Sequence, residues 1–204
     1  MGASGERGRR NRPARHGEAE SDVSARAPVV PKDLRWIQPR AQPDHELRDA
    51  DDRLVGALRF LPKPAVTWGR TDRRLARGEF GELHWDLSIE RKGLSGLLGL
   101  SGTALVDDGQ TAMVRAGPFL SFFSAGKLSM ANGLRFQWKG SALEGAPSRF
   151  VDEGGHTLLL FRNSSYLTRV NAFVDVQPEG SQMSEWPLLA VLGLYLRLLA
   201  NRTF

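Results

Sequence analysis

Residues 184 to 200 read Ser184-Glu185-Trp186-Pro187-Leu188-Leu189-Ala190-Val191-Leu192-Gly193-Leu194-Tyr195-Leu196-Arg197-Leu198-Leu199-Ala200. Ser184 can cap a helix N-terminus, Glu185 adds a negative charge there, and Pro187 is tolerated in a first turn. The residues that follow are apolar on nearly every helical face, and such a helix must be surrounded by apolar material. The sequence therefore predicts an apolar helix over 187–200, lying within the wider limits 185–201.

This helix is too short to span a membrane. At about 1.5 Å per residue it would cover about 20 Å, whereas a bilayer core of about 30 Å needs roughly 20 apolar residues. Arg197 also interrupts the apolar run. We therefore expect the rest of the domain to enclose the helix, and we do not expect an integral membrane protein.

The residues that could enclose the helix read as many short strands. In 83–90 and 134–139, large apolar residues alternate with polar ones, so each strand has one apolar and one wet face. Turn residues separate such runs, which is typical of antiparallel sheet. Further strands are predicted at 45–50, 53–60, 65–69, 100–106, 111–115, 119–123, 126–130, 156–161 and 168–176.

Acidic turns recur between these strands. Asp and Gly residues gather at 49–52, 107–109 and 152–155, and both tolerate the backbone conformations of tight hairpins. The stretches 83–115 and 134–162 both read strand, loop, strand, acidic turn, strand, as a duplicated meander would. Ten or more short strands favour a closed barrel, which leaves few exposed edges. The predicted fold is mainly β, an antiparallel barrel of about 10–12 strands around the C-terminal apolar helix.

Composition indicates one folded domain behind a polar leader. The chain has 204 residues, of which 41% are hydrophobic and 25% charged, with a net charge of +5, as in ordinary globular proteins. Residues 1–31 have almost no large apolar side chains and are predicted to be a disordered Arg-rich tail ahead of a domain over 32–204. The lack of Cys excludes disulfides, thiolate metal sites and a Cys nucleophile. Residues 1–30 contain no apolar segment typical of a secretory signal, so a cytoplasmic location is expected by default.

No residue pattern predicts catalysis or a bound metal. The Gly-rich run 93–102 lacks the Lys and the hydroxyl residue of a phosphate loop, which favours a connection between strands. The acids at 49–52 suggest calcium at first, but Arg53 and Leu54 stand where a calcium loop needs a ligand and a Gly. His84 has no histidine at a spacing suited to a shared metal, and no serine lies in a nucleophile elbow. We therefore expect no cofactor and no enzyme activity.

A barrel closed around a terminal apolar helix resembles the tubby C-terminal-like superfamily, which includes LURP-one-related proteins and phospholipid scramblases. The matching residues are Leu34-Arg35-Trp36, the hairpin His45-Glu46-Leu47-Arg48-Asp49 with Leu54-Val55-Gly56-Ala57-Leu58-Arg59-Phe60, and the closing run Leu188-Leu189-Ala190-Val191-Leu192-Gly193-Leu194-Tyr195-Leu196. They look like a bacterial branch of that group. The resemblance covers nearly all of 34–204. It implies no shared catalytic residues, and it implies binding of phosphoinositides or membranes through basic surface residues.

Basic residues suggest where such binding would lie. Arg135, Gln137 and Lys139 share the polar face of one predicted strand, and Arg162 and Arg169 lie on possible neighbouring strands. A basic sheet face attracts polyanions, although mixed surface charge also serves solubility alone. The predicted lipid-binding or anion-binding residues are Arg135, Lys139, Arg162 and Arg169.

The leading hypothesis is a non-enzymatic module that binds a phospholipid headgroup or a protein partner on its outer surface. Two alternatives stay open: a nucleic-acid tether made by the Arg cluster at 7–15, and a hydrolase assembled from scattered residues. Nucleic acid is the less favoured partner because the basic residues of the chain are diffuse. A barrel filled by its own helix leaves little room for an interior ligand, so binding is expected on the outer face or at the loop ends.

Overall fold

The computed structural model describes residues 29–39, 44–61, 75–90, 103–107, 112–116, 125–130, 132–140, 146–163 and 170–201. Within these ranges the strands are β1 (Leu34–Ile37), β2 (His45–Arg48), β3 (Leu54–Phe60), β4 (Ala76–Phe80), β5 (Leu83–Glu90), β6 (Thr103–Asp107), β7 (Ala112–Ala116), β8 (Ala125–Ser129), β9 (Arg135–Lys139), β10 (Ser148–Val151), β11 (Thr157–Arg162) and β12 (Val170–Val176). The helices are α2 (Pro178–Ser181) and α3 (Trp186–Asn201).

The strands form one closed antiparallel barrel. Each strand pairs with its neighbours in the chain, and β12 pairs with β1 to complete the ring. In the closing pair, Leu34 lies opposite Val174 and Arg35 opposite Phe173. Closure gives every strand two partners, so no strand edge is left unpaired. The predicted β barrel around a C-terminal helix is therefore confirmed.

The antiparallel order gives the barrel two unlike ends. One end carries the turns at 49–53, 81–82 and 152–156, and we call it the hairpin end. The start of α3 lies at this end, because the ring of Trp186 packs edge-on against Phe80 at 4.8 Å. At the opposite end, the connections between strands include residues outside the described ranges.

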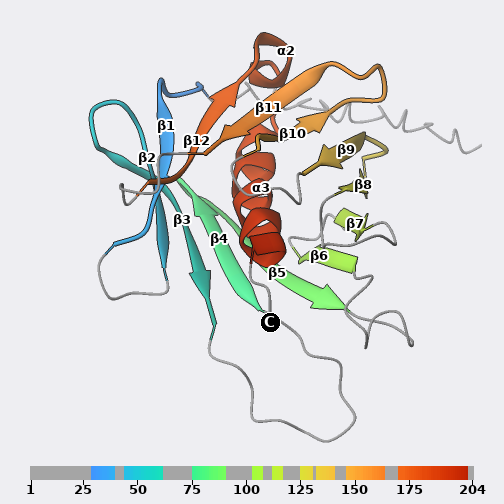
Figure 1. The fold of residues 1–204 in the computed structure, drawn as a ribbon, viewed down its shortest axis with the longest axis horizontal. Coiled ribbons are helices and arrows are strands. Elements are labelled where there is room, and N and C mark those ends of the chain that lie inside the picture. The colour runs from blue at the N-terminus through green and yellow to red at the C-terminus, as the bar shows by residue number, and fades with distance from the viewer. Residues whose placement is uncertain are drawn as a thin grey trace, which may run out of the picture.

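The helix α3 fills the barrel from one end towards the other, as Figure 1 shows in red. Residues 186–197 are all buried. Close contact with the wall requires glycine at two positions: a Cβ on Gly193 would overlap the ring of Phe161, and a Cβ on Gly78 would overlap Val191. The wall and the helix therefore form a single core, which the aliphatic residues of α3 share with the aromatic residues of the strands.

Most predicted strands are confirmed to within a few residues at each end. The elements β1, β4, β10 and α2 are not among the predicted ranges, although the pattern over 134–162 allows for β10. Predicted strands 65–69 and 119–123 lie outside the described residues, as do 1–28 of the predicted tail and the Gly-rich run 93–102.

Candidate anion-binding face

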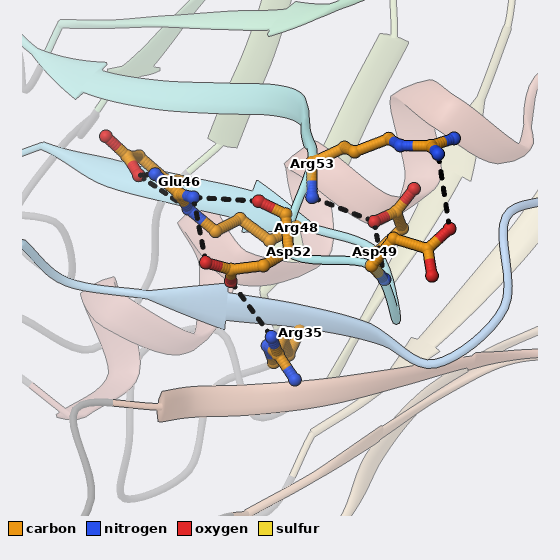
Figure 2. A network of polar contacts seen from close by, with 7 residues as sticks. Arg35, Glu46, Arg48, Asp49, Asp52 and Arg53 are labelled. Carbon is orange, nitrogen blue, oxygen red and sulfur yellow. Dashed lines mark hydrogen bonds and ion pairs between the residues drawn. The ribbon is translucent and has the colours of Figure 1, made fainter.

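Arginines and acids hold the turn between β2 and β3 together, as Figure 2 shows. Asp52 has a positive φ of 63°, and its carboxylate accepts hydrogen bonds from Arg35 at 2.9 Å and Arg48 at 3.3 Å. Arg48 also donates to Glu46 at 2.6 Å. The hydrogen bond from Arg35 is the main cause of the lowered pKa of Asp52. These charges stabilise one another across β1, β2 and the turn.

Asp49 stabilises the same turn through the backbone. Its Oδ1 accepts hydrogen bonds from the backbone N–H of Asp51 at 3.0 Å and of Arg53 at 2.9 Å, an arrangement typical of Asp in turns. Over the described part of the chain, no group of three His, Asp or Glu side chains could hold a metal ion. The acids at 49–52 therefore have an observed structural role in the hairpin.

Half-buried and exposed arginines on other strands, and Arg53 in the turn, are also paired with acids. These ion pairs join Arg35 to Asp52, Arg48 to Glu46, Arg53 to Asp51, Arg59 to Glu79, Arg77 to Asp86 and Arg162 to Asp175. Arg77 and Asp86 are direct register partners of β4 and β5, so the strand pairing itself brings their charges together.

The outer surface of β8, β9 and β10 has a different charge pattern. Lys127, Arg135, Lys139 and Arg149 are all exposed there, and we call these four residues the cationic face. Arg135 approaches Glu153 only at 3.7 Å, with side chains 70% and 71% exposed, so water screens this pair. Within the described residues, no ion pair engages the other three cations of the face. Among the described residues, the face is therefore a group of positive charges with one weak acidic partner, Glu153.

Strand register brings two of these cations directly together. Lys139 of β9 lies opposite Arg149 of β10, where side chains of directly opposed residues have Cβ atoms about 4.5–5.5 Å apart. Like charges at such positions are destabilising. On the other side of β9, Lys127 of β8 lies opposite the neutral Gln137. An oxyanion between Lys139 and Arg149 would remove the repulsion, because it could accept hydrogen bonds from both side chains.

The structure brings together only part of the predicted basic set. Arg135 and Lys139 are both exposed on β9, as the alternation predicts. The expectation that Arg162 lies on a strand beside β9 is wrong, because β10 lies between β9 and β11. Arg162 also donates two hydrogen bonds to Asp175, at 2.5 and 2.8 Å, which raise its pKa. Arg169 lies outside the described residues.

Sequence reasoning missed two members of the face, Lys127 and Arg149. Lys127 falls within the predicted strand 126–130, and its alternation with the buried Leu128 is a usable signal for an outward position. Arg149 lies on β10, which the sequence does not define as a separate strand. Its position beside Lys139 depends on pairing between strands and cannot be read from local sequence.

The three described histidines lie in different surroundings: a turn, the core and an outer hairpin. The backbone N–H of His156 donates to Asp152 Oδ1 of the same turn at 2.8 Å, and the ring Nδ1 of His156 lies 3.0 Å from Asp152 Oδ2. The side-chain hydrogen bond to Asp152 raises the pKa of His156. His45 is buried edge-on against Phe60. His84 lines a shallow depression on the β4–β5 hairpin, with Glu79 among its neighbours.

Together these features define a class of protein: a closed antiparallel barrel with a helical core and, among its described residues, a cationic outer face. None of the helices in the described residues is both long and apolar enough to cross a membrane. Comparisons with protein-family models, with curated proteins and with solved structures found no match to this chain. The resemblance to the tubby C-terminal-like superfamily therefore stays a prediction.

Proposed function

We propose that this protein is a non-enzymatic module whose cationic face binds the headgroups of anionic phospholipids at a membrane surface. The observation that carries the proposal is the segregation of charge on the barrel. On other strands, Arg35, Arg48, Arg59, Arg77 and Arg162 each have an acid beside them. By contrast, Lys127, Lys139 and Arg149 gather on three adjacent strands without such partners within the described residues. A one-signed face attracts a surface of opposite charge.

The expected strength of this attraction follows from the number of cations. Each Lys or Arg close to an anionic bilayer contributes about 1 kcal/mol, and the effect falls off within a Debye length. Four such residues can hold a protein reversibly at a membrane, and binding should weaken as salt is added. Headgroup phosphates also match the Lys139–Arg149 pair chemically, because guanidinium and ammonium groups both donate to phosphate oxygens.

Vesicle co-sedimentation tests the proposal. The full chain is incubated with phosphatidylcholine vesicles that contain or lack phosphatidylserine, and the variant carries Lys139→Glu together with Arg149→Glu. Binding should require the anionic lipid. The variant should bind at least about 30-fold more weakly, because the contribution of two cations, about 2 kcal/mol, is lost and replaced by repulsion.

A matched control separates the cationic face from net charge. Lys32→Glu with Arg53→Glu changes the net charge by the same amount on exposed residues near β1 and the β2–β3 turn, and it should bind nearly as well as the wild type. Equal losses in both variants would show that only overall charge matters, which contradicts the proposal. Retention on nucleic acid without any vesicle binding would assign the face to a different polyanion.

A further inference from the structure

Arg197 is a charged residue buried inside the barrel. It projects from α3, is 7% exposed, and donates from Nη1 to Ser148 Oγ at 3.1 Å and to the carbonyl of Phe161 at 3.3 Å. Nη2 donates to Asn163 Oδ1. Burial lowers the pKa of Arg197 to about 10, so the guanidinium still carries its charge at neutral pH. All three acceptors are neutral.

The charge of Arg197 has no counter-charge in the described part of the chain. Its contacts there are Ser148, Phe161 and Asn163, and none of them is acidic. Buried ions in proteins are normally paired, since an unpaired one is strongly destabilising. A guanidinium has five N–H donors, and the three hydrogen bonds leave Nε–H and one Nη2–H without an acceptor among the described residues. The site is therefore rich in donors and positively charged.

We propose that Arg197 binds a small oxyanion, of the phosphate or carboxylate class, at the end of the barrel opposite the hairpin end. The free donors of Arg197 are joined by the hydroxyl of Ser148, a buried side chain that accepts from Arg197 and keeps its own proton to donate. Asn163 supplies an amide donor and is partly exposed, so this edge of the site contacts solvent. This site is separate from the cationic face, because Ser148 and Arg197 face the barrel interior.

Thermal unfolding with inorganic phosphate or acetate, at constant ionic strength and low millimolar concentration, tests the site. A ligand that binds only the folded protein raises Tm by about 3–6 °C at ten times its Kd for a domain of this size. The decisive variant is Asn163→Asp, which places a carboxylate on Arg197 with almost no change in shape. This variant should have a higher Tm without added anion and should lose the response to phosphate and acetate.

Two further variants locate the response. Arg197→Met removes the charge at similar volume and should abolish the response, whereas Lys139→Gln with Arg149→Gln removes outer cations and should leave it unchanged. The same outer variant tests the proposed function independently, so failure of one proposal is distinguishable from failure of the other. The interior site is overturned if neither anion raises the Tm of the wild type, or if Asn163→Asp responds as the wild type does.

Discussion

Replacing Leu192 by Asp tests the claim that α3 is the core of the barrel. Leu192 is fully buried in the middle of α3, and the strands around it form a closed ring. The new carboxyl group therefore cannot reach water by a small rotation of its side chain. It must either stay in the core or force the helix out of the barrel.

The expected destabilisation can be worked out from burial. Loss of the apolar leucine contacts costs about 1.5–3 kcal/mol. At pH 7 the buried carboxyl must take up a proton roughly three units above its usual pKa, which costs about 4 kcal/mol. Its unmatched hydrogen-bonding groups add about 1–3 kcal/mol. The sum, about 6–10 kcal/mol, is comparable with the whole stability of an ordinary domain, about 5–15 kcal/mol.

Urea unfolding followed by tryptophan fluorescence measures this effect, because Trp36, Trp138 and Trp186 are all buried. We expect Leu192→Asp to be unfolded or nearly so at pH 7, with partial recovery near pH 4, where the acid is neutral without a proton penalty. The control is Leu83→Asp, since Leu83 is 48% exposed and should change stability by less than about 1 kcal/mol. A folded Leu192→Asp protein with the wild-type midpoint would refute the enclosed helix.

Two other predictions concern single contacts. Gly193→Ala should destabilise the fold by about 1–3 kcal/mol in urea unfolding, because the added Cβ overlaps the fully buried ring of Phe161; an unchanged midpoint would mean that the helix lies farther from β11. Asp152→Asn should lower the pKa of His156 towards its ordinary value of 6.5 in an NMR titration. Because the pKa of His156 is raised in the fold, its stabilisation is complete below pH 6.5 and fades as pH rises through the raised pKa. The pKa of Asp152 is lowered, so its contribution fades only as pH falls below about 4.

The parts of the fold that the sequence predicts are those with strong local patterns. The helix α3 is a continuous apolar run with start signals, and β5 and β9 alternate large apolar with polar residues. The strand β4 has only a weak signal, because two of its three inward residues, Ala76 and Gly78, are small and only Phe80 is large. A larger side chain at Gly78 would collide with Val191 of α3. Small wall residues are required where the helix passes close, and small residues carry little hydrophobic pattern.

The candidate sites are harder to predict, for a related reason. In β10, the polar Ser148 points inward, where it accepts a hydrogen bond from Arg197. A polar residue at an inward position interrupts the apolar–polar alternation by which a strand is recognised in a sequence. Because the strand is not recognised, the outward position of Arg149 is not predicted either. The pairing of Arg162 with Asp175 depends on the register of β11 and β12, which local sequence does not contain. Cations that form ion pairs can therefore be distinguished from those that do not only when the neighbouring strands are known.

Register also favours binding over simple solubility as the reason for the cationic face. The register partners of its residues on neighbouring strands are Ser129 for Arg135, Arg115 and Gln137 for Lys127, Ala125 and Arg149 for Lys139, and Leu160 for Arg149. A surface that only needs to be soluble is well served by interspersed charges of both signs, and β4 and β5 of this same barrel have that arrangement. None of these partner positions holds an acid. An acid at one of the exposed positions would pair with a cation at no steric cost, so its absence keeps the field of the face intact. An anionic surface would be attracted by that field. Because salt screens exposed charges, a loss of vesicle binding on addition of salt is the simplest result that distinguishes a binding role from a role in solubility alone.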